Sequence, residues 1–228
     1  MLRLVIGNKN YSSWSMRPWV LLTQFGIPFE EIMLKFGSTD WEENIARLSP
    51  SRMVPVLWNA DPQHPDASPI WDTLAIIETL AEMYPDKAIW PRQHGARALA
   101  RSMVAEMHAG FRALRSSMPM NIRASHPGLG MNADVANNIA RIESLWRQAR
   151  EQYGAAGPYL FGEFCAADAM YAPVVMRFKT YQPAIAKDTA AYCETIQNAA
   201  GVAAWIREAL QETEWVAEDE PYATPPAA

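Results

Sequence analysis

Residues 10–19 read Asn-Tyr-Ser-Ser-Trp-Ser-Met-Arg-Pro-Trp, and the rest of the chain is organised around this stretch. It follows a short apolar run at residues 2–6 and precedes a segment, residues 20–25, whose apolar side chains recur at helical spacing. This order predicts a strand, a loop and the N-terminus of a helix. A helix N-terminus carries unpaired N–H groups and about half a positive charge, so it stabilises an anion without a metal or a cationic side chain. Hydroxyl groups therefore gather where an anion would be stabilised.

The serines of this stretch divide between capping and binding. We predict that Ser15 is the N-cap of the helix and that Pro18 lies in the first turn, where a missing N–H costs little. Ser12 and Ser13 then lie outside the helix and are free to donate hydrogen bonds to a bound group. Taken alone, the stretch is explained as well by a polar loop with one capping serine, because serine is common in turns.

Length and composition exclude several classes of function. The chain has 228 residues, half of them apolar, which is enough for one large or two small cores. Its net charge is −5 with acidic and basic residues interspersed, so neither nucleic acid nor a membrane surface is expected as a partner. There is no signal-peptide pattern, and we expect a cytoplasmic protein. Cys165 and Cys193 are far apart, without a CxxC motif or a histidine cluster, so neither a disulfide framework nor a metal site is indicated.

The first part of the chain has the pattern of an α/β domain. A second strand is predicted at residues 29–34, and because a helix of about ten residues separates it from the first, the two should be parallel. A weak helical pattern at residues 41–48 and a strand at residues 51–58 follow. A return strand at residues 69–71 then leads into an amphipathic helix that Asp72 or Thr73 can cap. We assign residues 1–84 to this domain.

The second part has only helical patterns. Residues 85–95 contain Pro85, Pro91 and Gly95 and are expected to be a linker. Residues 96–228 form an all-α bundle in this interpretation, with a loose Pro/Ala-rich end from Pro221. Two long apolar stripes define its first helices: Leu99, Met103, Met107, Phe111, Leu114 and Met118, then Val135, Ile139, Ile142, Trp146 and Ala149. Further helices are expected at residues 166–177, 188–200 and 202–213.

The order of these elements and four motifs resemble the glutathione S-transferase family over almost the whole chain. Residues 12–17, Ser-Ser-Trp-Ser-Met-Arg, resemble the Ser-Ser-Cys-Ser-Trp-Arg motif of zeta-class members, the maleylacetoacetate isomerases. Ser49-Pro50 followed by residues 54–57, Val-Pro-Val-Leu, resembles the family's Asn-Pro and Val-Pro-x-Leu motifs. Residues 72–80 resemble its Glu/Gln-Ser-x-Ala-Ile-x-Glu-Tyr-Leu stretch, and residues 164–169 its Ser/Thr-x-x-Asp capping box, here with Cys165 at the cap and Asp168 retained. Each motif alone is weak evidence, whereas several in register with this topology are specific.

The resemblance implies a fold, a co-substrate and an assembly. The fold is an α/β thioredoxin-like N-terminal domain, with a cis peptide bond before Pro55, followed by an all-α C-terminal helical bundle. Glutathione is the implied co-substrate, no metal is required, and the family is typically cytoplasmic, dimeric and active in detoxification. We therefore expect a homodimer that binds glutathione and a small electrophile.

The resemblance also implies a set of glutathione-binding residues. Ser12 aligns with the catalytic serine, which donates a hydrogen bond to the glutathione thiolate and is not itself a nucleophile. The Val54 backbone would pair with the cysteinyl part of glutathione as an added strand does. Tyr11 is the alternative contact of the sulfur, and Arg17 is a secondary candidate that could instead tie the loop to the second domain. The implied glutathione-binding residues are Ser13, Arg52, Val54, Pro55, Asp72 and Thr73, where Asp72 and Thr73 hold the γ-glutamyl group and Arg52 a carboxylate.

A second group of residues indicates the electrophile. His108, Arg112 and Arg115 fall at positions i, i+4 and i+7 of one predicted helical face, beside Met107 and Phe111. Each of these cations alone is better explained as part of a solvated basic face. Together they support the hypothesis that the second substrate carries a carboxylate.

The sequence does not choose between three reactions of the thiolate: conjugation, peroxide reduction and cis–trans isomerisation. A glutathione-dependent disulfide oxidoreductase is disfavoured, because such enzymes place a cysteine at the active site. This chain has Trp14 where the zeta motif has a cysteine, and it has no cysteine before Cys165. The alternative from another class is a non-catalytic member of the fold that binds glutathione or a protein.

Overall fold

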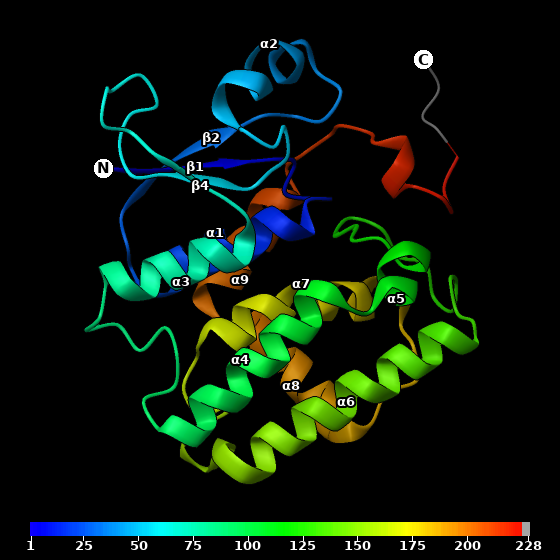
Figure 1. The fold of residues 1–228 in the computed structure, drawn as a ribbon. Helices are drawn as coiled ribbons and strands as arrows, with labels where there is room; N and C mark the ends of the chain where they lie inside the picture. Colours follow the sequence, from blue (N-terminus) through cyan, green and yellow to red (C-terminus); the bar gives the residue numbers. More distant parts are fainter. Residues whose placement is uncertain (225–228) are drawn as a thin grey trace.

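A computed structural model describes residues 1–224, and its first part is a four-stranded sheet with the strand order β2-β1-β3-β4 (Figure 1). β1 pairs with β2 in parallel, whereas β3 is antiparallel to β1 and β4 is antiparallel to β3. The predicted β-α-β unit and the hairpin that follows it are therefore confirmed. The strands are β1 (Leu2–Ile6), β2 (Phe29–Met33), β3 (Val56–Trp58) and β4 (Pro69–Ile70).

Three helices cover the two faces of this sheet. α1 (Ser13–Gln24) and α3 (Thr73–Met83) lie on one face, and α2 (Thr39–Leu48) lies on the other (Figure 1). The alternation of side chains along a strand produces both apolar layers. Leu4 of β1 packs into the large core beneath α1 and α3, whereas its neighbour Val5 packs into a smaller cluster beneath α2.

The loop between α2 and β3 is held in a defined shape. The Val54–Pro55 peptide bond is cis, as the resemblance implied. Pro55 lies just before β3, which is paired on both sides, so the proline marks the entry to the strand and not a sheet edge. The hydroxyl of Ser49 donates to the carbonyl of Met53 at 2.7 Å and accepts its N–H at 3.1 Å. These contacts fix the backbone immediately before Val54.

The second part of the chain is helical, as predicted. None of the helices in the described residues is long and apolar enough to cross a bilayer. Two short 3₁₀ turns, Gly154–Ala156 and Ala217–Asp219, complete it. The helices are α4 (His94–Ala109), α5 (Arg112–Ser117), α6 (Ala133–Tyr153), α7 (Ala166–Tyr181), α8 (Lys187–Asn198) and α9 (Ala200–Ala209).

The prediction of one helical stripe from residue 99 to residue 118 is wrong. The helix ends at Ala109, and Phe111 adopts a left-handed backbone conformation with φ of 56°. A Cβ atom at Gly110 would lie 2.7 Å from the carbonyl oxygen of Glu106, so the chain can turn there because it has glycine. α5 then begins in a new direction, and side chains on either side of the break do not share a face.

α7 is the buried helix of the second part, and its start is closed by a carboxylate. The Asp168 side chain accepts the N–H of Cys165 at 2.9 Å, the N–H of Leu160 at 3.1 Å and the hydroxyl of Tyr192 at 2.9 Å. The capping box that the motif predicted is therefore present. Burial raises the pKa of Asp168 to about 6, and its hydrogen-bond donors oppose that rise.

The end of the chain returns across the molecule after α9 (Figure 1). The Tyr222 ring packs against Tyr181, and its hydroxyl donates to the carbonyl of Ser117 at 2.7 Å. The expectation of a loose end from Pro221 is therefore wrong for Tyr222, because an aromatic residue among the prolines and alanines supplies an anchor. Residues 225–228 lie outside the described part of the chain.

Candidate active site

The N-terminus of α1 begins three residues earlier than the sequence predicted. Ser12, and not Ser15, is the N-cap, since its Oγ accepts the N–H of Ser15 at 3.3 Å. The Ser12 hydroxyl also donates to the Ser15 Oγ at 2.7 Å, and that oxygen accepts the N–H of Gly7 at 3.2 Å. The prediction failed because both serines have a suitable side chain and only the backbone distinguishes them.

The earlier start places Pro18 inside the helix and not in its first turn. Proline has no N–H, so the carbonyl four residues before it, that of Trp14, is left without its helical partner. The hydroxyl of Thr73, the first residue of α3, donates to this carbonyl at 3.2 Å. Thr73 is fully buried, and its hydroxyl therefore joins the N-termini of α1 and α3.

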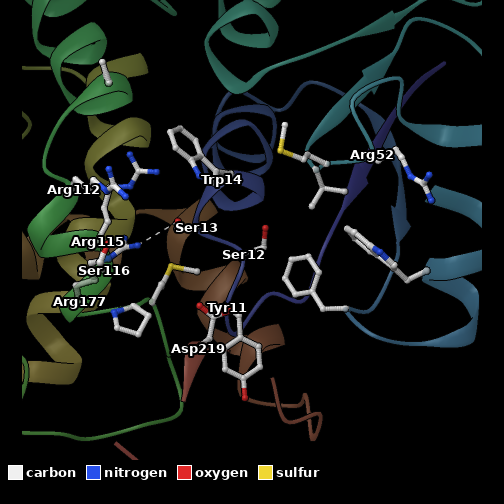
Figure 2. A pocket seen from close by; sticks show the side chains of 17 residues that line it. Tyr11, Ser12, Ser13, Trp14, Arg52, Arg112, Arg115, Ser116, Arg177 and Asp219 are labelled. Carbon is white, nitrogen blue, oxygen red and sulfur yellow. Dashed lines mark hydrogen bonds between the residues drawn. The ribbon is translucent and has the colours of Figure 1, made fainter. Parts of the chain in front are cut away.

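The positive end of α1 faces a cavity of about 630 Å³ between the two parts of the molecule (Figure 2). The first turn of α1 contains no acidic residue, so its partial positive charge is not neutralised within the helix. Ser12 and Ser13 line the cavity from this end, and Arg52 and Val54 line it from the loop before β3. α5 and α7 supply the opposite wall.

A second cavity of about 440 Å³ adjoins the first and shares Trp14, Met53 and Val54 with it. Asp72, the N-cap of α3, lies here and accepts the N–H of Leu74 at 3.1 Å. The His108 Nε2 atom, from α4, lies 3.2 Å from the other carboxylate oxygen of Asp72. The N-terminus of α1 thus faces the first cavity and that of α3 faces the second, and the two cavities share part of their walls.

Val54 lines both cavities. It precedes β3 by two residues, and among the described residues neither its N–H nor its carbonyl oxygen has a hydrogen-bond partner. Half-buried backbone groups without partners are ready to pair with an extended peptide. This arrangement fits the main chain of a small peptide ligand such as glutathione.

Most of the residues that the sequence singled out are brought together, but in two groups. Arg112 and Arg115 line the first cavity from α5, opposite the serines. The second cavity contains Pro55, Asp72, Thr73 and His108, so His108 lies with the predicted γ-glutamyl site and not with the two arginines.

Met107 and Phe111 do not have the predicted place at the substrate cavity. Met107 is fully buried and Phe111 is 7 % exposed, and both belong to the hydrophobic core. The break at Gly110 explains this correction, because it rotates α5 relative to α4 and leaves Ala109 to line the cavity between them. The helical face that the spacing suggested does not exist.

Tyr11 directs its hydroxyl away from Ser12, as Figure 2 shows. The hydroxyl donates to the Glu220 carboxylate at 2.7 Å and accepts a hydrogen bond from Arg123 at 2.9 Å. Burial raises the pKa of Tyr11, with Glu220 acting in the same direction. Its position disfavours the alternative in which Tyr11 contacts the sulfur.

Two guanidinium groups lie against the Trp14 ring. The Arg17 guanidinium carbon is 4.3 Å from the ring centroid and that of Arg115 is 4.6 Å from it. Arg17 is fully buried and donates to the carbonyls of Met170 and Ser13, each at 3.0 Å. Burial holds its pKa well below the usual value. Arg17 thus ties α1 to α7.

Sequence reasoning missed Arg177, which lies on α7 and reaches the first cavity. It is 3 % exposed, donates to the carbonyls of Met118 at 2.9 Å and Pro173 at 3.1 Å, and approaches the Ser13 hydroxyl at 3.4 Å (Figure 2). Burial lowers its pKa to about 10, so it stays protonated at neutral pH. The signal that could have found it is an arginine within a helix whose other residues are almost all buried.

Asp219 was also missed, because it comes from the short turn after α9 and has no motif around it. It is the acidic side chain among the described residues that line the first cavity, against four arginines. Burial raises the pKa of Asp219 to about 6, and the nearby charge of Arg177 opposes this. The cavity therefore has an excess of positive charge. In the described part of the chain, no group of three or more His, Cys, Asp or Glu side chains is placed to hold a metal ion.

Comparison with known proteins agrees with this geometry. Residues 11–83 match the family model described as the glutathione S-transferase N-terminal domain. A curated relative, maleylacetoacetate isomerase from Dictyostelium discoideum, is 21 % identical over 166 residues, which cover 70 % of this chain and 73 % of that protein.

Solved structures share the whole fold. A glutathione transferase homologue from Burkholderia, with bound glutathione, has a TM-score of 0.67 at 21 % identity and covers 91 % of this chain and 97 % of its own. A diazinon-metabolizing glutathione S-transferase from the silkworm Bombyx mori has a TM-score of 0.69 at 15 % identity, covering 92 % and 98 %. The expected thioredoxin-like domain with a helical C-terminal domain, and the resemblance that the motifs indicated, are confirmed.

Proposed function

Because residues 11–83 form a glutathione S-transferase N-terminal domain, we propose that this protein is a glutathione-dependent transferase in which Ser12 stabilises the thiolate of glutathione. One observation carries the proposal. The hydroxyl that caps α1 lies at a helix N-terminus that has no acidic residue in its first turn and that faces the first cavity. Such a site stabilises an anion beside Ser12.

In this proposal the tripeptide extends through both cavities, which share three lining residues, and is held at its two ends. Val54 would pair with the middle of glutathione through its free N–H and carbonyl. Asp72 would accept from the γ-glutamyl ammonium group, and the first N–H groups of α3 would donate to the neighbouring carboxylate. Ser13 and Arg52 would complete the site at the first cavity. The chemistry that glutathione supplies is a sulfur nucleophile.

The energy required from Ser12 is modest. A free thiol has a pKa of about 8.5, so about 3 % is ionised at neutral pH, and lowering that pKa by two units requires about 2.7 kcal/mol. A hydrogen bond to a charged acceptor contributes about 1.5–3 kcal/mol, and a helix N-terminus adds about 0.3–1 kcal/mol. No general base is needed. This agrees with the lining of the first cavity, where the described residues include no histidine and Asp219 as the one carboxylate.

The second substrate would be a small electrophile that carries a carboxylate. Arg112, Arg115 and Arg177 line the first cavity, none of them is within ion-pair distance of a carboxylate in the described residues, and only Asp219 opposes their charge. Of the three reactions open to the thiolate, similarity to a maleylacetoacetate isomerase favours cis–trans isomerisation by reversible thiol addition. Conjugation and peroxide reduction are the alternatives.

Two further features belong to the same proposal. Trp71 and Met53 line the second cavity and are 46 % and 65 % exposed, and a second copy of the chain would cover their exposed parts in a homodimer. We place the boundary between the glutathione-binding domain, residues 1–84, and the helical domain, residues 96–228, in the irregular segment that separates α3 from α4.

The Ser12→Ala variant tests the proposal. We expect the pKa of the bound glutathione thiol, followed by the ultraviolet absorbance of the thiolate, to rise by about one to two units. Turnover at neutral pH should fall by about tenfold to a hundredfold and recover as the pH is raised. Ser102→Ala is the matched control, because Ser102 is an exposed serine on α4 that bonds only to its own helix.

Two outcomes would contradict this function. An unchanged thiol pKa in Ser12→Ala would remove the role of the hydroxyl. Retention of the wild-type protein on immobilised glutathione, without turnover of any electrophile in a panel of unsaturated acids, peroxides and halogenated aromatics, would favour the non-catalytic alternative.

A further inference from the structure

Behind Ser12 lies a second hydroxyl that no ligand can touch. Ser15 is fully buried at the start of α1, and its Oγ is 2.7 Å from that of Ser12. It also accepts the N–H of Gly7, the residue that follows β1, at 3.2 Å. A chain of hydrogen-bonding groups therefore runs from the end of the sheet, through Ser15, to the hydroxyl that faces the cavity.

The number of hydrogens that these groups can donate limits how their hydrogen bonds can be arranged. Each hydroxyl has one hydrogen to donate and can accept two hydrogen bonds. In the structure Ser12 donates to Ser15, and the buried Ser15 hydrogen has no acceptor among the described residues. The Ser12 hydrogen is thus directed into the protein and not toward the cavity.

In the reversed arrangement each hydroxyl is rotated about its Cβ–Oγ bond, and Ser15 becomes the donor of the hydrogen bond between them. Ser15 then donates to the Ser12 Oγ, which already accepts the N–H of Ser15 at 3.3 Å. Both acceptor positions of the Ser12 oxygen are filled in this arrangement, so its hydrogen is free to point at an anion in the cavity. Hydrogen bonds that run in one direction through connected groups strengthen one another.

We propose that Ser15 is a positioning residue, which donates to Ser12 when a thiolate is bound and so turns the Ser12 hydrogen toward the sulfur. The proposal rests on the proposed function of Ser12 and goes beyond it. Gly7 supplies the fixed donor at the inner end, Ser15 transmits the direction, and Ser12 is the group that contacts the ligand. The second serine of the Ser-x-x-Ser motif thus has a role other than the capping that the sequence suggested.

A double-mutant cycle on the thiol pKa tests this inference. We expect Ser15→Ala to raise the pKa of bound glutathione by about 0.5–1 unit, so that turnover at pH values below the pKa falls by about threefold to tenfold. The high-pH plateau should be kept. In the Ser12→Ala background, Ser15→Ala should have no further effect, because the residue through which it acts is absent.

The controls separate positioning from a loss of stability. Thr189→Val removes another buried hydroxyl, on α8, which lines neither of the two cavities, and should leave the thiol pKa unchanged. If Ser15→Ala does not fold, Ser15→Cys keeps an atom at the same place but is a weak donor. Its buried thiol does not titrate near neutral pH, so the pH profile of kcat/KM reports glutathione, and a rise in the same direction is expected.

Each failure has its own meaning. If Ser12→Ala itself leaves the thiol pKa unchanged, the proposed function is wrong and the role of Ser15 is lost with it. If Ser12→Ala raises the pKa but Ser15→Ala and Ser15→Cys do not, or if Ser15→Ala shifts it equally in both backgrounds, only the inference about Ser15 is overturned.

Discussion

Two helices of this protein begin in the same way and end up with opposite roles. α1 starts with Ser12 and has Ser15 three residues later, whereas α7 starts with Cys165 and has Asp168 three residues later. In both, the later side chain bonds back toward the cap. The Asp168 carboxylate collects three donors and is completely buried. The Ser15 hydroxyl receives a backbone N–H and leaves the helix end uncharged.

The difference shows how one charge decides what a helix N-terminus does. At α7 the chain supplies its own anion, so the donors at that end stabilise the fold. At α1 the chain supplies only hydroxyls and opens the end to a cavity, so the same partial charge is available to a ligand. Three substitutions test this contrast in turn. They remove the acidic residue Asp168 from α7, add an acidic residue to α1, and replace Asp219 on the other side of the cavity.

Removing the acid from α7 should have the largest effect. Asp168→Ala leaves two N–H groups and the Tyr192 hydroxyl buried without their acceptor, and we expect a loss of about 3–5 kcal/mol in the free energy of unfolding. In a chain of this size the melting temperature, measured by calorimetry, should fall by roughly 10 °C. Asp188→Ala, an exposed acid at the start of α8, is the control and should change it little.

The pH dependence of that loss has a defined sign. The folded pKa of Asp168 is raised to about 6 from the ordinary value of 3.8, so the folded state binds this proton more tightly than the unfolded state. Its contribution to stability is therefore fully present below the ordinary value and decreases as the pH rises toward 6. The difference between wild type and Asp168→Ala should widen when the pH is lowered through that range, and a constant difference would contradict the assignment.

An acidic residue in the first turn of α1 should neutralise the partial positive charge of its N-terminus, so that this charge is no longer available to a ligand. Ser13→Asp places a carboxylate beside the Arg177 guanidinium, which approaches the Ser13 hydroxyl at 3.4 Å. The melting temperature should stay within a few degrees. The thiol pKa of bound glutathione should rise by about one unit or more, because a like charge then lies close to the sulfur, and turnover at neutral pH should fall by about tenfold.

Ser13→Asn is the matched comparison for this substitution, since it has the same shape without the charge. It should retain most of the activity. Equal thiol pKa values in the aspartate and asparagine variants would mean that the uncharged first turn of α1 is not what stabilises the anion.

Changing the acid across the cavity should have the smallest effect. Asp219 has a pKa raised to about 6 by burial, so it is ionised above that pH and opposes the charge of Arg177 for an acidic substrate. The KM of a carboxylate-bearing electrophile should therefore decrease as the pH falls through about 6. Asp219→Asn should lower that KM by about twofold to fivefold at pH values above 6 and remove this pH dependence.

A neutral electrophile provides the control for Asp219. Its KM should be the same in wild type and Asp219→Asn at every pH. A parallel change for the neutral and acidic electrophiles would show that the segment carrying Asp219 acts by closing the cavity and not by its charge.

The sheet and most helices could be predicted because each is determined locally. A short apolar run marks β1, and the periodic apolar stripe of residues 135–149 marks α6. The start of α1 could not be predicted to the residue, since Ser12 and Ser15 are equally good caps and the choice depends on the N–H of Gly7, which lies in the preceding loop. Local patterns of side chains do not contain that information.

The cavity was predictable only in part: the serines and two arginines of the opposite wall were expected, whereas Arg177 and Asp219 were not. Motifs identified Ser12 and Asp72 because each begins a helix directly after a strand or loop of recognisable pattern. Arg177 and Asp219 lie more than 150 residues from Ser12 in the sequence, and their place depends on how α7 and the chain end pack against α1. Helical spacing also misassigned Met107, because the helical period was continued past Gly110, where the backbone turns and α4 ends.

The proline inside α1 has a consequence for which peptides the site accepts. Pro18 leaves the Trp14 carbonyl without its helical partner, and the Thr73 hydroxyl donates to it, so the two helix N-termini are held at a fixed separation by a contact between two residues that also line the second cavity. We expect this fixed separation to select ligands by the distance between their thiol and their amino group. A thiol compound whose amino end lies one residue nearer its sulfur would bind at the N-terminus of one helix and not reach the other. Because the distance between the two helices is fixed, the protein would not adapt to the shorter compound.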